Sequence, residues 1–234
     1  MTFAVFIKMS NKNLKHIKME LSNTLAARKA KNSQNIPAEK WTIMERSTNE
    51  LKEASISSFA IQKGATLPSF NLLDVEEART TLEDFKNDFL VVSFYRGGWC
   101  PFCNLELQAL QNILPQLKEL NASLIAISPE TPDNSLSTTE KNELEFTVLS
   151  DINNEYAKSL GLVFQMPKDL QEVYHSFNLN VDIHNGNTDY ELPMPATYIV
   201  NKEREIIYSF TPEDYTERLD PEVILEVIKK QNSH

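Results

Sequence analysis

Cys100 and Cys103 are the only cysteines of this 234-residue chain. The apolar run at residues 89–95 before them is typical of a buried strand, and residues 105–110 after them favour a helix that Pro101 would open. A thiol at a helix N-terminus has a lowered pKa, because the helix dipole stabilises the thiolate. The sequence therefore predicts a reactive thiol where the strand becomes the helix.

The spacing of the two cysteines predicts their roles. Side chains three residues apart on one helical turn share a face and lie within the reach of a disulfide. We expect Cys100, nearer the positive end of the helix and more exposed, to be the nucleophile. Cys103, one helical turn further from the helix start, would then react with the product that forms on Cys100.

Two other interpretations remain for the cysteine pair, namely inert buried thiols or half of a zinc site. Zinc requires about four N, S or O ligands, and the four histidines of the chain are scattered without ligand spacing. We therefore favour a redox-active pair that needs no metal and no cofactor.

Composition indicates an ordinary globular protein, with 41% hydrophobic and 24% charged residues. No apolar run approaches the ~20 residues of a membrane span, so we expect no membrane partner. The apolar opening at residues 1–7 is interrupted by Lys8 and lacks the basic region of a signal peptide. We expect a cytoplasmic protein, and in a reducing compartment a Cys-x-x-Cys pair is typically redox-active or metal-binding.

The net charge of −10 is unevenly distributed. Up to Lys63 there are 11 Lys and Arg against 5 Asp and Glu, whereas from Gly64 onward there are 12 against 28. The acidic body argues against nucleic acid as a partner. The basic segment is also typical of an arm that binds nucleic acid or membrane, but we favour its docking on an acidic body, its own or that of a partner subunit.

Residues 1–62 are predicted to form an N-terminal helical hairpin, and residues 63–234 the redox domain. Leu14, Ile17, Leu21 and Leu25 form one apolar stripe, and after a break at residues 32–37 a second stripe comprises Trp41, Met44, Thr48, Leu51, Ser55 and Phe59. Such a hairpin needs a surface to cover. We expect either the main domain or a second copy of the chain, which would give a homodimer through the N-terminal helices.

Strands and helices alternate along the body. Strands are predicted at residues 122–128, 146–149, 197–200 and 205–210, helices at 136–142, 155–160, 168–177 and 221–230, and a polar loop at 182–187. The alternation of strands and helices, followed by a strand hairpin and a final helix, predicts an α/β fold with helices on both faces of the sheet.

Five segments in this order carry a resemblance to a known family. They are Arg96-Gly97-Gly98-Trp99-Cys100-Pro101-Phe102-Cys103, Ile127-Ser128-Pro129-Glu130-Thr131, Val148-Leu149-Ser150-Asp151, Leu192-Pro193-Met194-Pro195-Ala196-Thr197 and Asp214-Tyr215-Thr216-Glu217-Arg218. With them the chain, from about residue 63 to 228, resembles the AhpC/TSA peroxiredoxin-like family. The resemblance implies a thioredoxin-like fold with a central mixed sheet.

The same resemblance implies the chemistry of the pair. Cys100 corresponds to the peroxidatic cysteine, which attacks a peroxide to give a sulfenic acid, and Cys103 would condense with it to a disulfide. An external reductant, thioredoxin-like or glutathione, would reopen that disulfide. The usual family pattern has Pro seven residues before the cysteine and Thr or Ser three before, whereas this chain has Ser93 and Gly97. Its Cys-Pro-Phe-Cys instead resembles a glutaredoxin or thioredoxin centre.

Three further residues are candidates for supporting roles. Arg96 would stabilise the Cys100 thiolate or a peroxide oxygen, or it is a surface charge at a strand end. Trp99 would shield the disulfide or dock a partner, or it belongs to the core. Pro195 matches the thioredoxin-fold position that usually carries a cis-proline, so we expect a cis bond there rather than an ordinary trans turn.

The remaining polar residues of the motifs are given structural roles. We expect Glu130 to be a solvated loop acid and Arg218 to pair locally with Asp214, and we assign His175 and His184 no partner. The leading hypothesis is a thiol-dependent peroxidase for hydrogen peroxide or organic hydroperoxides. The alternatives are a disulfide reductase with little peroxidase activity and a non-catalytic redox sensor or binding module.

Overall fold

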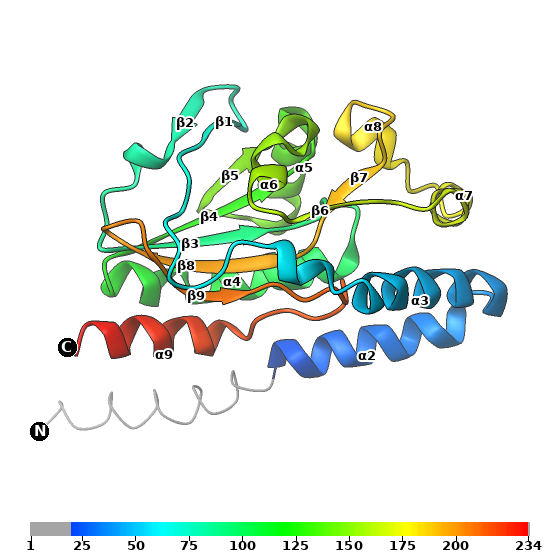
Figure 1. Ribbon diagram of the computed structural model, residues 1–234, viewed down its shortest axis with the longest axis horizontal. Coiled ribbons are helices and arrows are strands. Elements are labelled where there is room, and N and C mark those ends of the chain that lie inside the picture. The colour runs from blue at the N-terminus through cyan, green and yellow to red at the C-terminus, as the bar shows by residue number, and fades with distance from the viewer. Residues whose placement is uncertain (1–19, 234) are drawn as a thin grey trace, which may run out of the picture.

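The computed structural model of the chain describes residues 20–233 (Figure 1). The predicted helical positions Leu14 and Ile17, and the apolar opening at residues 1–7, lie outside the described residues. A seven-stranded sheet forms the centre, in the order β2-β1-β5-β4-β3-β8-β9. A second sheet of two strands, β6 and β7, stands apart from it.

The central sheet is mixed. Strands β3 (Phe89–Phe94), β4 (Ala122–Ser128) and β5 (Thr147–Ser150) run parallel, whereas β8 (Ala196–Asn201) pairs antiparallel with β3 and β9 (Ile206–Phe210) antiparallel with β8. On the other side, β1 (Asn71–Asp74) pairs antiparallel with β5 and with β2 (Arg79–Thr81). All six residues of β3 are buried, and burial on both faces explains its continuous apolar sequence.

Helices cover both faces of this sheet, as predicted. On one face, Val91, Leu124 and Ile199 pack in a cluster with the apolar sides of α4 (Pro101–Glu119) and α9 (Pro221–Gln231). On the other face, Val92 and Ile125 pack with α6 (Glu155–Ser159) and with the segment that enters the sheet at residues 60–72. Helix α5 (Pro132–Asn142) lies beside α4, where Asn142 donates a hydrogen bond to Asn104.

The described part of the N-terminal segment forms two helices, α2 (Glu20–Asn35) and α3 (Ala38–Glu53), which lie side by side (Figure 1). Leu21 and Leu25 of α2 join the same cluster as α4. Met44 of α3 joins a third cluster with α7 (Lys168–Ser176). We call residues 20–53 the arm, and the division of the chain at residue 62 stays a prediction.

Ion pairs hold the basic arm on the acidic body of its own chain, as the charge distribution predicted. The ammonium groups of Lys29 and Lys52 each lie 3.0 Å from Asp214 Oδ2, and Arg46 pairs with Asp169. The Asp214 side chain is 4% exposed, so its charge is largely removed from water.

Some predicted boundaries were wrong. The second arm helix ends at Glu53 rather than at Phe59, because Ser55 adopts the left-handed conformation (φ 48°) and starts the 3-10 turn η1 (Ile56–Phe59). The predicted polar loop at residues 182–187 contains the short helix α8 (Val181–Asn185), which Gly186 ends with φ 67°. Strands β6 (Val163–Gln165) and β7 (Glu191–Pro193), and the short strand β2, were not predicted.

Two further 3-10 turns, η2 (Leu82–Asp84) and η3 (Ile152–Asn154), connect the strands. Within residues 20–233, no helix is long and apolar enough to cross a membrane.

Candidate active site

The two cysteines lie at the junction of β3 and α4, where the sequence placed them. Cys100 is the N-cap residue of α4 and Pro101 its first helical residue. The turn before the helix is closed by a hydrogen bond from Cys100 N–H to the Gly97 carbonyl (3.1 Å) and by one from the Asn104 amide to the Gly98 carbonyl (2.8 Å). The strand, turn and first helical turn therefore hold the thiols in one fixed place.

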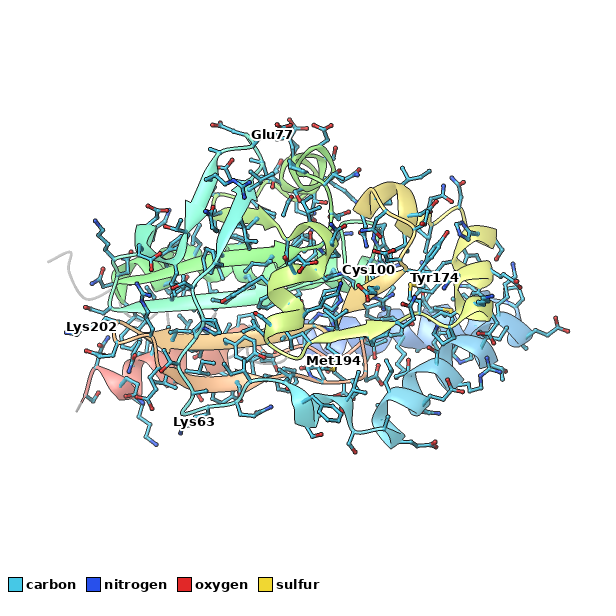
Figure 2. The ribbon with its side chains drawn as sticks, turned by 45° about the horizontal axis from the view of Figure 1, so that its top comes forward. Lys63, Glu77, Cys100, Tyr174, Met194 and Lys202 are labelled. Atoms are coloured by element: carbon cyan, nitrogen blue, oxygen red, sulfur yellow. The ribbon has the colours of Figure 1, made fainter. Side chains whose placement is uncertain are left out.

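Both thiols are free and buried, with Cys100 2% and Cys103 0% exposed. Cys100 is the more exposed of the two, as predicted, but only by a small margin. Cys100 lines a cavity of about 270 Å³, which we call the site pocket. The pocket is lined by Asn32, Ile36, Met44, Arg96, Trp99, Cys100, Pro101, Phe102, Tyr174, Phe177, Leu179 and Tyr215. Figure 2 shows Cys100 and Tyr174 close together at the end of the sheet near α7.

The environment separates the pKa values of the two thiols. Burial alone would raise the pKa of Cys100, but a hydrogen bond from Cys103 and the charges of Arg96 and Arg218 outweigh it and lower the pKa to about 5. Burial and the neighbouring Cys100 raise the pKa of Cys103 well above its ordinary value. At neutral pH, Cys100 is therefore a thiolate and Cys103 a thiol, which agrees with the predicted order of attack.

Arg96 is 2% exposed, so it is not a surface charge. Its guanidinium carbon lies 4.4 Å from the ring centroid of Tyr215 and 5.0 Å from that of Trp99, and its Nη2 donates a hydrogen bond to the Tyr174 hydroxyl. The buried Nε finds no hydrogen-bond partner in the described part of the chain. The aromatic rings thus hold a cation beside Cys100 with one donor unused.

Arg218 was wrongly predicted to pair with Asp214. It forms a buried ion pair with Glu106 of α4 (Nε to Oε2, 2.5 Å), and its Nη2 donates a hydrogen bond to Cys103 Sγ (3.3 Å). Its Nη1 donates to the carbonyls of Tyr215 and Glu217. Burial raises the pKa of Glu106 to about 7 despite the neighbouring cation. Arg218 is therefore held by Glu106 and by backbone carbonyls while it contacts the Cys103 sulfur.

Gly97 stands where the family pattern has Thr or Ser, and the backbone explains why. Its φ is +149°, which side chains rarely adopt, and a Cβ there would lie 2.2 Å from Trp99 Nε1. A threonine at this position requires Trp99 to move. The absence of a hydroxyl side chain at residue 97 and the position of the Trp99 indole therefore depend on each other.

Trp99 is half-buried and meets the ring of Tyr174 at a centroid distance of 5.7 Å in an edge-on arrangement. It forms part of the pocket wall and packs against the cluster around Met44. Trp99 thus packs at the edge of the core, and its predicted roles in shielding the disulfide or docking a partner stay predictions.

Glu130 is 1% exposed, so the expected solvated loop acid is wrong. Its carboxylate accepts hydrogen bonds from Gly98 N–H (2.9 Å) and from the Thr138 hydroxyl (3.2 Å), and His184 Nδ1 lies 3.1 Å away. His184, to which no partner was assigned, thus joins Glu130 in holding the turn before Cys100. His175 contacts Asn180 and Tyr190.

Pro195 is buried between β7 and β8, but its peptide bond is trans, because no cis bond occurs at residues 20–233. The cis expectation was wrong. The trans form is favoured by about 0.5–1 kcal/mol, and a trans proline fits directly before the extended start of β8, where its missing N–H removes no ladder bond.

The structure brings together more residues than the sequence predicted. Arg96, Trp99 and Cys100 meet at the pocket, whereas Cys103 lies behind Cys100 and, like Pro195, does not line it. Tyr174, Tyr215, Ile36 and Met44 carry no sequence signal for this role. Among the described residues, no group of three or more His, Cys, Asp and Glu side chains is arranged to hold a metal ion.

Comparison with known proteins places this site in a family. The model of the "AhpC/TSA family" matches residues 63–209. The chain is 32% identical over 118 residues to the chloroplastic peroxiredoxin Q of Gentiana triflora, covering 50% of this chain and 52% of that protein. It is 23% identical over 158 residues to the thiol-disulfide oxidoreductase ResA of Bacillus thuringiensis, covering 67% of this chain and 74% of ResA.

The structure of peroxidoxin BcpB from Mycobacterium tuberculosis superposes with a TM-score of 0.59 at 17% identity, over 73% of this chain and 97% of that one. This likeness confirms the thioredoxin-like fold. The chain spans about half to just under two thirds of the length of the curated peroxiredoxins that it matches. The arm lies before the matched residues.

Proposed function

Because the chain belongs to the AhpC/TSA family, we propose that it is an oxidoreductase, a thiol-dependent peroxidase that reduces hydrogen peroxide or organic hydroperoxides. The observation that carries this proposal is the Cys100 thiolate, with its pKa lowered to about 5, on a pocket that the Arg96 cation also lines. A thiolate is the nucleophile in peroxide reduction, and a fixed cation stabilises the negative oxygen that leaves.

In the first step, Cys100 Sγ attacks the terminal oxygen of the hydroperoxide. The S–O bond forms as the O–O bond breaks, and the leaving alkoxide or hydroxide takes a proton to become an alcohol or water. Cys100 is oxidised to a sulfenic acid. Arg96, stacked on Tyr215 at 4.4 Å, provides a fixed positive charge that stabilises the negative charge on the leaving oxygen.

In the second step, Cys103 Sγ attacks the Cys100 sulfur, the S–S bond forms, and the S–O bond breaks to release water, with the Cys103 proton balancing the charge. Cys103 lies one helical turn from Cys100, and its sulfur already accepts a hydrogen bond from Arg218. An external dithiol then reduces the disulfide by exchange.

The partners are part of the proposal. We expect a thioredoxin-like dithiol or glutathione as reductant, no nucleic acid or membrane partner, no cofactor, and a cytoplasmic location. A homodimer through the N-terminal helices stays a prediction. Since Leu21, Leu25 and Met44 are buried against the same chain, such a dimer has to use other faces of the arm.

A thiol–disulfide oxidoreductase is the second candidate. Gly97 in place of the activating hydroxyl favours it, and so does the likeness to ResA over a larger part of both chains than the peroxiredoxin Q match covers. The buried Cys100 argues against direct exchange with a bulky protein disulfide, because such a disulfide has to reach the sulfur through the pocket.

Thiol loss after adding one equivalent of peroxide to the reduced protein tests the proposal. We expect the parent to lose two thiols rapidly, Cys103→Ser to lose its single thiol at a similar rate, and Cys100→Ser to react at least about 100-fold more slowly, since the remaining thiol has a raised pKa. Mass spectrometry of Cys103→Ser should show one added oxygen.

Two outcomes would contradict the peroxidase. Slow reaction with peroxide but rapid exchange with a small disulfide would leave the thiol–disulfide oxidoreductase. No reaction with peroxide or disulfide would leave a redox sensor or binding module.

A further inference from the structure

We propose that Ile36 and Met44 of the N-terminal segment make the site pocket selective for hydroperoxides that carry a compact apolar organic group, in preference to hydrogen peroxide. This inference rests on the proposed peroxidase function. It assigns a substrate-selecting role to residues that precede the family match at 63–209.

The polar and apolar parts of the pocket are separated. Its reactive part consists of Cys100 and Arg96, whereas its other walls are mainly apolar or aromatic, including Phe177 and Leu179. A hydroperoxide bound with its O–O group at Cys100 therefore directs its organic substituent towards apolar walls. Hydrogen peroxide has no such substituent and leaves these walls in contact with water, which forfeits the free energy of apolar burial.

The arm provides two of these walls. Ile36 directly follows α2, and Met44 lies in α3, where it is 9% exposed. Ile36 packs, half-buried, against the cluster that contains Met44 and Tyr174. The arm therefore contributes to the pocket with side chains that are already ordered by packing.

The arm is also fixed close to the reactive residues. Asp214, which binds Lys29 and Lys52 of the arm, directly precedes Tyr215, and the Tyr215 ring both lines the pocket and stacks on Arg96. The segment at residues 214–215 therefore both binds the arm and forms part of the site pocket.

The size of the pocket limits the substrate. Its volume of about 270 Å³ is near the lower end of the ~300–1,000 Å³ typical of small-molecule sites. A compact group such as cumyl or tert-butyl is of suitable size, whereas a long acyl chain has to extend outside.

The test compares the rates with which reduced protein consumes cumene hydroperoxide and hydrogen peroxide, expressed as a ratio for each variant. In the double variant Ile36→Gln, Met44→Gln, two apolar walls become polar at similar volume, and we expect the ratio to fall about tenfold. Ile43→Gln is the matched control. Ile43 is the neighbour of Met44 and is half-buried against the same cluster, but it does not line the pocket. The ratio of the Ile43→Gln variant should therefore stay within about twofold of the parent's ratio.

A second variant keeps the test decisive where the polar substitutions impair folding. Ile36→Trp fills part of the pocket with apolar volume, so the ratio of the cumene hydroperoxide rate to the hydrogen peroxide rate should fall about tenfold. The ratio is independent of the active fraction of each preparation.

The outcomes distinguish this inference from the function on which it rests. A parent protein that reduces both peroxides, with a ratio unchanged in the Gln and Trp variants, overturns the selective role of the arm alone. A parent that reduces neither peroxide overturns the proposed peroxidase itself.

Discussion

Gly97 shows at the scale of one residue how this site departs from the usual family pattern. Its φ of +149° and the 2.2 Å approach of an added Cβ to Trp99 leave no place for the usual threonine. The threonine or serine hydroxyl of the family pattern is absent because the Trp99 indole occupies the space next to residue 97. Arg96, stacked on Trp99 and Tyr215, then supplies a fixed positive charge that helps to lower the pKa of Cys100.

We predict that Gly97→Ala lowers the free energy of unfolding by about 2–4 kcal/mol, because it adds a steric clash to backbone strain. The tryptophan fluorescence should change as well, since Trp99 has to move. Urea unfolding followed by fluorescence measures both. Gly64→Ala is the matched control, because Gly64 also has a positive φ (+92°) but an added Cβ meets nothing within 4 Å. Equal losses in the two variants would contradict the clash.

Residue types and spacing predicted the position of the cysteine pair at the strand–helix junction, but not the partners of the charged residues; the order of attack stays a prediction. Arg218 and Glu130 were visible as motif residues, yet their contacts with Cys103 and Gly98 join segments 115 and 32 residues apart. Local sequence carries no information on such pairs. Burial of Cys100 was missed for the same reason, since Tyr174 and Tyr215 come from distant parts of the chain.

At the scale of elements, the central strands and the helices that flank them were predictable because apolar periodicity determines them. The arm was predicted as two amphipathic helices, and its docking followed from charge. Short strands and helix ends were missed. β6 and β7 have three residues each and exist through their mutual pairing, and the end of α3 depends on one left-handed residue, Ser55.

Docking of the arm should depend on Asp214. Burial alone would raise the pKa of Asp214, but hydrogen bonds from Thr216, Lys29 and Lys52 outweigh it and hold the pKa below its usual range. The ion pairs therefore contribute fully above the ordinary pKa of an aspartate, and their contribution is lost as the pH falls through the lower, folded-state value.

We predict that Asp214→Asn lowers the free energy of unfolding by about 1–2 kcal/mol at pH 7 and speeds proteolytic cleavage within residues 20–53. Asn retains an acceptor for Thr216, so the change isolates the charge. Asp169→Asn is the comparison, because the Asp169–Arg46 pair is exposed and such pairs contribute only about 0–1 kcal/mol. An arm that is no more sensitive to protease in Asp214→Asn than in the parent would refute this role.

At the scale of the whole molecule, the stability of the fold should depend on the redox state of the pair. The folded pKa of Cys100, about 5, lies below that of an unfolded cysteine. The resulting stabilisation is full above the unfolded pKa and is lost as the pH falls through 5. At pH 7 it amounts to about 2–3 kcal/mol, and a disulfide form does not have it.

We predict that the reduced protein loses about 2–3 kcal/mol of stability relative to the oxidised protein when the pH is lowered from 7 to 5. Thermal or urea unfolding of both forms at the two pH values measures this difference. Glu106, with its pKa raised to about 7, titrates in the same pH range in both forms. The informative quantity is therefore the free energy of unfolding of the reduced protein minus that of the oxidised protein. Cys100→Ser, which has no disulfide form, should lose no more stability between pH 7 and pH 5 than the oxidised parent does, and a constant difference between the two forms of the parent would refute the prediction.

The two buried guanidinium groups beside the pair have an electrochemical consequence. By favouring the thiolate, Arg96 and Arg218 favour the dithiol over the disulfide. A stabilisation of 2–3 kcal/mol corresponds to a reduction potential on the order of 60 mV less negative than that of an unassisted pair. We therefore expect that a weaker reductant can reopen the Cys100–Cys103 disulfide than an unassisted pair would require, and that the dithiol is favoured as the resting form.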